Sequence, residues 1–365
     1  MRFVPVNILR EGMCVGKSVY DRNNQLLLGK GSLIRESYIN KLLEMGYQGI
    51  YIEDTISSDI EVKDIIHDEL RRKTVNIIKD VFVETNHNNN DFSNYLIETK
   101  LLMTQIVEEL LENRDTIVNL IDLKIFDDYT FYHSVNVAVL SILLGTTLEL
   151  NKEQLYNLGL GAILHDIGKM FIDNSILNKK GKLTDEEFFE IQKHPQYGYK
   201  YLKETFQIPL SSYVAVLQHH EKYNGTGYPN RISKDKISLF AQIISIADVY
   251  DALTSNRPYR KALLPSEAIE YIMGNGGVMF DIKLVKRFIS KIAPYPVGTG
   301  VELSNKYKGF VVENYEDAIL RPRIKVVLDD NNKEINGVYF NLRNEKSLRN
   351  VTIVSNNLSL TPQLC

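Results

Sequence analysis

The chain has 365 residues, of which 44% are hydrophobic and 24% are charged, as in an ordinary soluble protein of two or three domains. Its 43 basic residues nearly balance its 46 acidic residues, which excludes the globally basic surface of a protein that binds a nucleic-acid polymer. No apolar stretch approaches the ~20 residues that span a bilayer, and the two cysteines stand near opposite ends of the chain. We therefore expect a cytoplasmic protein with no membrane contact and no disulfide.

Residues 1–56 alternate short apolar runs with polar turns and include one helical stretch, which predicts a small, strand-rich α+β N-terminal domain. Apolar residues then recur at spacings of three and four, so residues 57–98 are expected to form a helical linker. The helices across 57–123 carry apolar stripes longer than a compact domain needs. These stripes would suit pairing between two copies of the chain in a homodimer.

From about Tyr129 to Ile292, nearly every segment is helical by its period, with glycines and prolines at the breaks. We therefore predict a helical bundle and place its domain at 99–294. After Pro294, short β-branched stretches alternate with turn residues, which predicts a small β-rich C-terminal domain over 295–365. The expected fold class is mainly α, with a small α+β domain before the bundle and a small β-rich domain after it.

The helical region contains a set of metal-binding residue types, five histidines and two aspartates: His133, His165, Asp166, His194, His219, His220 and Asp248. Spacings of 25 to 32 residues separate successive groups, about one helix out and one helix back, so an antiparallel bundle can bring them to one end of its core. Imidazoles and carboxylates together suit first-row divalent ions. A single such histidine is usually a hydrogen-bonded core residue, but all these groups without an ion would leave many buried polar atoms unpaired.

Two of these groups are adjacent pairs, His165 with Asp166 and His219 with His220. Neighbouring side chains on a helix point about 100° apart, so each pair can address two ions rather than one. A carboxylate between two ions can bridge them, and two ions roughly 3.5 to 4 Å apart are an arrangement that hydrolyses phosphate esters. The pattern therefore favours a two-metal site.

Several blocks of sequence surround these residues in a fixed order: His165-Asp166-Ile167-Gly168-Lys169, His219-His220-Glu221, Gly227-Tyr228-Pro229, and Ala247 to Thr254 followed by Arg257-Pro258-Tyr259-Arg260. In this order and spacing, over about 101–292, they closely resemble the HD-GYP proteins, bacterial cyclic di-GMP phosphodiesterases of the HD superfamily. The resemblance implies that the bundle of 99–294 is an HD-GYP catalytic domain.

The resemblance also implies that the seven clustered side chains bind two divalent ions, iron or manganese, with Asp166 as the bridge. Some members of the family place a glutamate four residues before the first histidine, where it reaches a third ion. That position is Tyr129 here, so we expect two ions. The resemblance further implies that Lys169 contacts the scissile phosphate, and that Arg257 and Arg260 bind the phosphate or guanine of the ligand.

Three smaller expectations concern the residues around the cluster. Gly168 can end the helix that carries the HD pair and turn the chain towards the ions. Tyr228 stands in a loop whose glycines and proline preset its shape, and it is expected to pack against a guanine face. Glu221 is expected to orient an imidazole rather than to bind an ion itself.

The expected activity is metal-dependent hydrolysis of the phosphodiester bonds of cyclic di-GMP to pGpG or GMP. Bound ions would lower the pKa of a water, and Asp166 and Lys169 would be the catalytic residues. Two alternatives stay open: a receptor that binds cyclic di-GMP without cleaving it, and an HD phosphohydrolase for another nucleotide such as cyclic GMP-AMP. Turnover kinetics would identify the first alternative, and a substrate panel the second.

Overall fold

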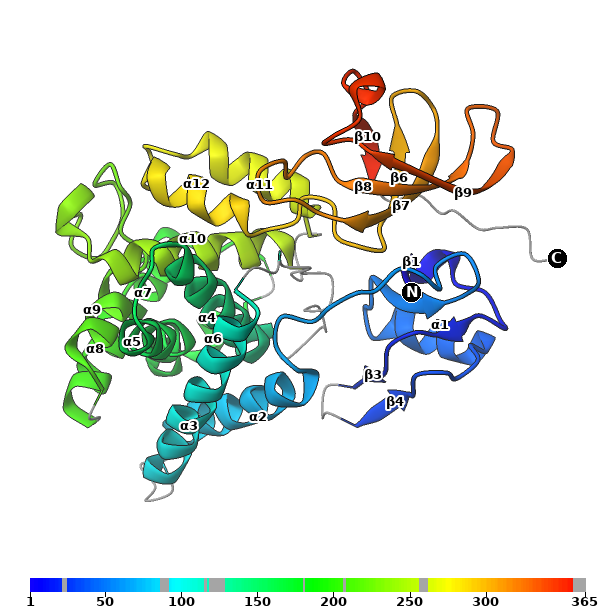
Figure 1. The fold of residues 1–365 in the computed structure, drawn as a ribbon. Helices are drawn as coiled ribbons and strands as arrows, with labels where there is room; N and C mark the ends of the chain where they lie inside the picture. Colours follow the sequence, from blue (N-terminus) through cyan, green and yellow to red (C-terminus); the bar gives the residue numbers. More distant parts are fainter. Residues whose placement is uncertain are drawn as a thin grey trace. The chain divides into compact units, whose positions relative to one another are not determined.

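The computed structural model describes most of the chain, namely residues 1–21, 25–85, 92–114, 117, 129–179, 181–205, 208–255 and 262–356. The chain forms two compact units. The helical unit contains Ile65–Thr116 and Tyr129–Lys291, and the terminal unit contains Met1–Asp64 and Ile292–Cys365. Figure 1 shows the helices of the helical unit from light blue (α2) to yellow, and the strands of the terminal unit in darker blue and in orange to red.

The helical unit is built from α-helices and short 3-10 turns, with these bounds: α2 (Asp68–Thr85), α3 (Phe92–Glu112), α4 (Tyr129–Thr147), α5 (Lys152–Ile163), η3 (Ile167–Phe171), α6 (Asn174–Leu177), α7 (Asp185–Ile191), α8 (His194–Thr205), α9 (Leu210–Gln218), η4 (Lys234–Lys236), α10 (Leu239–Thr254), α11 (Pro265–Gly274) and α12 (Ile282–Ser290). Helix α4 packs against α5 and α10, while α9 packs against α5, α8 and α10. Residues 132–145 of α4 are all buried, because a helix that is apolar on every side belongs in the core. The prediction of a helical bundle is confirmed.

Local signals fix where the helices that lead to the cluster begin. Helix α5 starts at a capping box, in which the Asn151 side chain accepts from the backbone N–H of Gln154 and the Gln154 side chain accepts from that of Asn151. Helix α10 starts at Ser238, whose hydroxyl accepts from the backbone N–H of Ala241. Because each cap fixes the first residue of its helix, it also fixes the direction in which every later residue of that helix points.

The terminal unit carries the strands. Near the amino end, β1 (Arg2–Pro5), β5 (Gly49–Glu53) and β2 (Cys14–Val15) form an antiparallel sheet in that order, beside the hairpin of β3 (Val19–Tyr20) and β4 (Leu26–Leu28) and helix α1 (Glu36–Glu44). Near the other end, an antiparallel sheet has the order β10 (Ile353–Asn356), β6 (Gly300–Leu303), β7 (Lys308–Glu313), β8 (Arg323–Leu328) and β9 (Glu334–Asn341). The mainly α fold class, with small strand-rich regions at both ends, is confirmed.

The two segments predicted as domains, 1–56 and 295–365, both lie in the terminal unit. The Phe3 amide donates to the Gly298 carbonyl at 3.1 Å, and Ile60 packs with Phe310 in a small shared apolar cluster. The helices from Ile65 onwards belong to the helical unit. Independent folding of the 1–56, 57–98, 99–294 and 295–365 segments, and pairing through 57–123, stay predictions. Within the described residues, no helix has both the length and the apolar character that crossing a membrane requires.

Candidate metal centre

The seven predicted ligands come together from separate helices of the helical unit. His133 lies in the second turn of α4, His165 and Asp166 follow α5, and His194 begins α8. His219 and His220 follow α9, and Asp248 lies in α10. All of these residues except His220 are at most 9% exposed, and the His220 side chain is 25% exposed. The cluster is therefore deeply buried, with His220 as its most accessible ligand.

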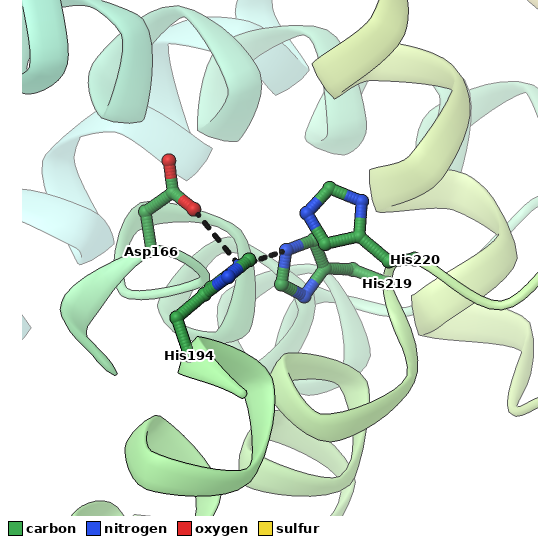
Figure 2. A group of neighbouring side chains, drawn as sticks. All are labelled: Asp166, His194, His219 and His220. Carbon is green, nitrogen blue, oxygen red and sulfur yellow. Dashed lines mark hydrogen bonds and ion pairs between the residues drawn. The ribbon is translucent and has the colours of Figure 1, made fainter. Parts of the chain in front are cut away.

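Three sets of side chains each offer ligand atoms within 4.8 Å of one another: Asp166 with His194, His219 and His220; His133 with His165 and Asp166; and His165 with His219 and Asp248. The sets together contain all seven predicted ligands, and Asp166 belongs to two of them. Figure 2 shows the four-residue set, in which the Asp166 carboxylate and the His194 and His219 rings point towards one another. His165 and His219 also belong to two sets each, and of these three shared residues Asp166 is the one with a carboxylate, a group that can bridge two ions.

Hydrogen bonds fix the orientation of three imidazoles. In His165, His194 and His219, Nδ1 lies 2.7 Å from the backbone carbonyl oxygen three residues earlier. Each of these histidines follows a helix end, where carbonyl oxygens have no partner within the helix. Since Nδ1 donates to a carbonyl, Nε2 carries a lone pair, and this is the tautomer that binds a metal through Nε2.

The buried acceptor atoms face one another without a donor between them. Nε2 of His194 lies 3.3 Å from Nε2 of His219, and 3.4 Å from Oδ1 of Asp166. Nε2 of His165 and Oδ1 of Asp166 are buried and have no hydrogen-bond partner among the described residues. Buried acceptors without a donor cost free energy, and a cation between them would remove that cost. The donor set and its unsatisfied atoms thus fit a divalent metal ion.

Burial also keeps these groups in the protonation state that binds metal. It lowers the pKa of His194 to about 3 and that of His220 to about 4, and it holds the pKa of His219 well below the usual value, with the neighbouring imidazoles adding to the effect. Burial would raise the pKa of Asp166, but the Lys169 ammonium and His165 hold it well below its usual range. At neutral pH, His194, His219 and His220 are therefore neutral and Asp166 is ionised.

His133 differs from the other imidazoles because carboxylates lie at both of its ring nitrogens. Its Nε2 is 3.2 Å from Oδ1 of Asp248, and its Nδ1 is 2.7 Å from Oδ2 of Asp251. Burial alone would lower the pKa of His133, but these two carboxylates outweigh it and raise the pKa to about 9. Sequence reasoning missed Asp251, since one more aspartate three residues after a candidate ligand carries no distinguishing pattern.

This raised pKa predicts that binding of a divalent ion at His133 depends on pH, unlike binding at the set around His194 and His220. Below about pH 9, His133 holds a proton that a cation at Nε2 must displace, so the affinity of that site should fall about tenfold for each pH unit. The set around His194 and His220 should bind independently of pH from 6.5 to 8.5, because their pKa values lie far lower. Calorimetric titration of Mn²⁺ into metal-free protein at pH 6.5, 7.5 and 8.5 measures both. Two pH-independent events would contradict this assignment.

Lys169 and Gly168 lie in η3, directly after the HD pair. Lys169 Nζ donates to Oδ2 of Asp166 at 2.5 Å, and its side chain is 30% exposed. Gly168 was expected to end the preceding helix, but α5 ends earlier, at Ile163. A Cβ at Gly168 would lie 1.9 Å from the His194 carbonyl oxygen, so the glycine serves a close approach of η3 to α8.

The loop after His220 differs from expectation in the role of Glu221. Its carboxylate accepts from the backbone N–H groups of Asn230 at 2.6 Å and Ile232 at 3.1 Å, so the expectation that it orients an imidazole is wrong. It instead holds the two ends of the loop together. The Tyr228 ring lies against the His220 ring, with centroids 4.7 Å apart and planes 32° apart. Contact of Tyr228 with guanine stays a prediction.

Three further positions from the sequence analysis concern the substrate and a third ion. Arg257 and Arg260 lie outside the described residues, so their roles stay predictions. Tyr129 is the first residue of α4, one turn before His133. The expectation of two ions, based on Tyr129 at this position, stays a prediction.

Comparison with known proteins places this site in a family. Residues 107–284 match the model of the HD domain family. The chain is 39% identical over 232 residues to a cyclic di-GMP phosphodiesterase of Pseudomonas aeruginosa, and the aligned region covers 64% of this chain and 56% of the relative. It is also 39% identical over 147 residues to a 3'3'-cGAMP-specific phosphodiesterase of Vibrio cholerae, which covers 40% of this chain and 32% of the relative.

Among solved structures, an HDGYP protein from Bdellovibrio bacteriovorus matches with a TM-score of 0.52 at 20% identity, over 78% of this chain and 97% of that one, which shows a shared fold. The chain spans about half the length, or less, of the curated relatives it matches first. The family match covers the helices that bring the histidines and aspartates together. Residues 107–284 therefore form an HD domain, and the resemblance of this region to the HD-GYP proteins is confirmed.

Proposed function

We propose that the chain hydrolyses the phosphodiester bonds of cyclic di-GMP, with pGpG or GMP as product. The observation that carries this proposal is the buried cluster in which Asp166 belongs to two potential metal-binding sets. Paired divalent ions are suited to phosphodiester hydrolysis. The name of the Pseudomonas aeruginosa relative supports the same reaction and the same substrate.

The seven clustered side chains would hold two ions, iron or manganese. His194, His219 and His220 would bind one ion and His133 with His165 the other, with Asp166 between them, as in two of the three sets of ligand atoms. The third set contains both His165 and His219 and adds Asp248, whose Oδ1 lies 3.2 Å from Nε2 of His133, so Asp248 would join the ion at His133. When bound, such ions lower the pKa of a water and polarise a phosphate oxygen. Seven ligands for two roughly octahedral ions leave coordination positions for water and substrate.

Lys169 would act on the phosphate. Its ammonium contacts the carboxylate of Asp166, and its side chain is partly exposed. A phosphate that binds at the ions would therefore lie within reach of this ammonium. A cation held at this place stabilises negative charge that develops on the phosphoryl oxygens in the transition state. Asp166 would thus hold both the ions and the ammonium.

The Lys169→Gln variant tests this role. We expect turnover of cyclic di-GMP to fall about 100- to 1,000-fold, as for other losses of one transition-state donor, while two ions per chain are retained. Anaerobic protein loaded with Mn²⁺ or Fe²⁺ is incubated with cyclic di-GMP, and the products are separated by chromatography. Lys152→Gln is the matched control, because Lys152 is an exposed lysine on α5 whose partner is Glu108. Undiminished turnover by the Lys169 variant would remove the residue from the mechanism.

A second candidate substrate is cyclic GMP-AMP, which the name of the Vibrio cholerae relative favours. A panel of cyclic dinucleotides, compared by kcat/KM, ranks the two substrates. Tight binding of cyclic di-GMP by metal-loaded wild-type protein without turnover of any member of the panel would instead identify a receptor.

A further inference from the structure

Helices α4 and α10 face each other through two pairs of polar residues. His133 and Asn136 are three positions apart on α4, and Asp248 and Asp251 are three positions apart on α10. Residues at this spacing lie on one face of a helix, about one turn apart. His133 contacts both aspartates, and Nδ2 of Asn136 donates to Oδ1 of Asp251 at 2.9 Å. A row of polar contacts therefore runs along the packed faces of the two helices.

The place of His133 in the chain explains why it needs a carboxylate partner. The other oriented imidazoles, such as His165, donate from Nδ1 to a backbone carbonyl at a helix end. His133 lies within α4, where carbonyl oxygens accept from the next turn of the helix, and the Thr130 carbonyl also accepts from the hydroxyl of Ser134. An acceptor for its Nδ1 must come from another element, and Asp251 supplies it.

Asp251 is itself held on several sides and is only 3% exposed. Oδ1 accepts from Asn136 and Oδ2 faces Nδ1 of His133, while the hydroxyl of Ser255 lies 3.5 Å from Oδ2. Asn136 is 2% exposed, and within the part of the chain that the structure describes its Oδ1 has no partner while its Nδ2 donates to Asp251. A buried carboxylate with this many donors has a fixed position, and it fixes the ring that donates to it.

We propose that Asp251, held by Asn136, is a positioning residue that orients His133 so that Nε2 faces Asp248 and Asp166. This inference rests on the proposed two-ion site, in which His133 serves one ion, His194, His219 and His220 serve the other, and Asp166 lies between them. Asp251 has no other imidazole within the contacts that the structure gives it. Loss of Asp251 should therefore lower the affinity for one ion and leave the affinity for the other unchanged.

Asp251→Ala and Asp251→Asn, each in the full chain, test the proposal by ion binding. At pH 8.5, where proton competition for His133 is reduced, metal-free protein is dialysed against a series of free Mn²⁺ concentrations and its bound metal is measured. We expect Asp251→Ala to bind one ion as wild type does and the second about 10- to 100-fold more weakly. Asp251→Asn should restore most of that affinity, because its amide oxygen can still accept from Nδ1 while Asn136 turns to accept from its amide N–H.

Asp281→Asn is the matched control, since Asp281 caps α12 through the Lys283 amide and is not among the predicted ligands. It should bind both ions as wild type does. If Asp251→Ala bound both ions equally more weakly, or bound both with wild-type affinity, the proposal would be overturned. Turnover of cyclic di-GMP by wild-type protein is measured in parallel, so failure of the proposed reaction is seen separately from failure of this assignment.

Discussion

Replacing Asp166 with alanine should remove tight binding of both ions and reduce turnover of cyclic di-GMP by more than about 100-fold. Residues that only orient a metal ligand typically contribute about 10- to 100-fold, and Asp166 belongs to two of the potential metal-binding sets. The variant also leaves His165 and His194 without the anion that lies near their Nε2 atoms. Elemental analysis after gel filtration and anaerobic turnover assays measure the two effects.

The control for this variant is Asp281→Ala, which removes an aspartate that caps α12. It should lower the free energy of unfolding by about 1 kcal/mol, as lost N-caps do, and leave both ions bound. If Asp166→Ala kept both ions at wild-type affinity, a bridging role for this carboxylate would be wrong, whatever its activity.

The second large effect is expected from Gly168→Ala. The new Cβ would lie 1.9 Å from the carbonyl oxygen of His194 and 2.5 Å from the backbone nitrogen of Gly198. Both are backbone atoms, so relief requires η3 and α8 to separate. Overpacking of this kind costs about 1 to 3 kcal/mol or more, and we expect at least the upper value. Because His194 begins α8, its ion should also bind more weakly. Urea unfolding of metal-free protein and Mn²⁺ titration measure the two losses.

Gly274→Ala is the control, because Gly274 is the last residue of α11 and a Cβ there would meet nothing within 4 Å. This change should leave stability unaltered or raise it by up to about 1 kcal/mol, since alanine reduces the freedom of the unfolded chain. A Gly168 variant as stable as the Gly274 variant would show that η3 and α8 do not need their close approach.

The position of the cluster could be predicted from the sequence because it depends on residue types and on their spacing along the chain. Imidazoles and carboxylates repeated at helix-pair spacing, such as His165 with His194, predict convergence in an antiparallel bundle, and the structure brings these side chains together. The helical character of this region was equally legible, since α4 is apolar on every side and α10 nearly so.

What the sequence did not reveal depends on contacts between distant segments. Asp251 becomes informative only when α10 lies against α4, and Glu221 only when the loop returns to place Asn230 beside it. Gly168 looked like a helix end because glycine is common there, whereas its actual constraint is a backbone that belongs to α8. Likewise, no local pattern connects Phe3 to Gly298, the contact that helps to join the two ends of the chain in one unit.

In the proposed site, these imidazoles and carboxylates hold a pair of catalytic ions. The most direct test is elemental analysis of anaerobically purified protein, combined with cyclic di-GMP turnover before and after removal of its metal. We predict two equivalents of iron or manganese per chain, and turnover that disappears with the metal and returns when two equivalents are restored. Protein that binds fewer than two equivalents, or that hydrolyses cyclic di-GMP at an unchanged rate without metal, would contradict this account.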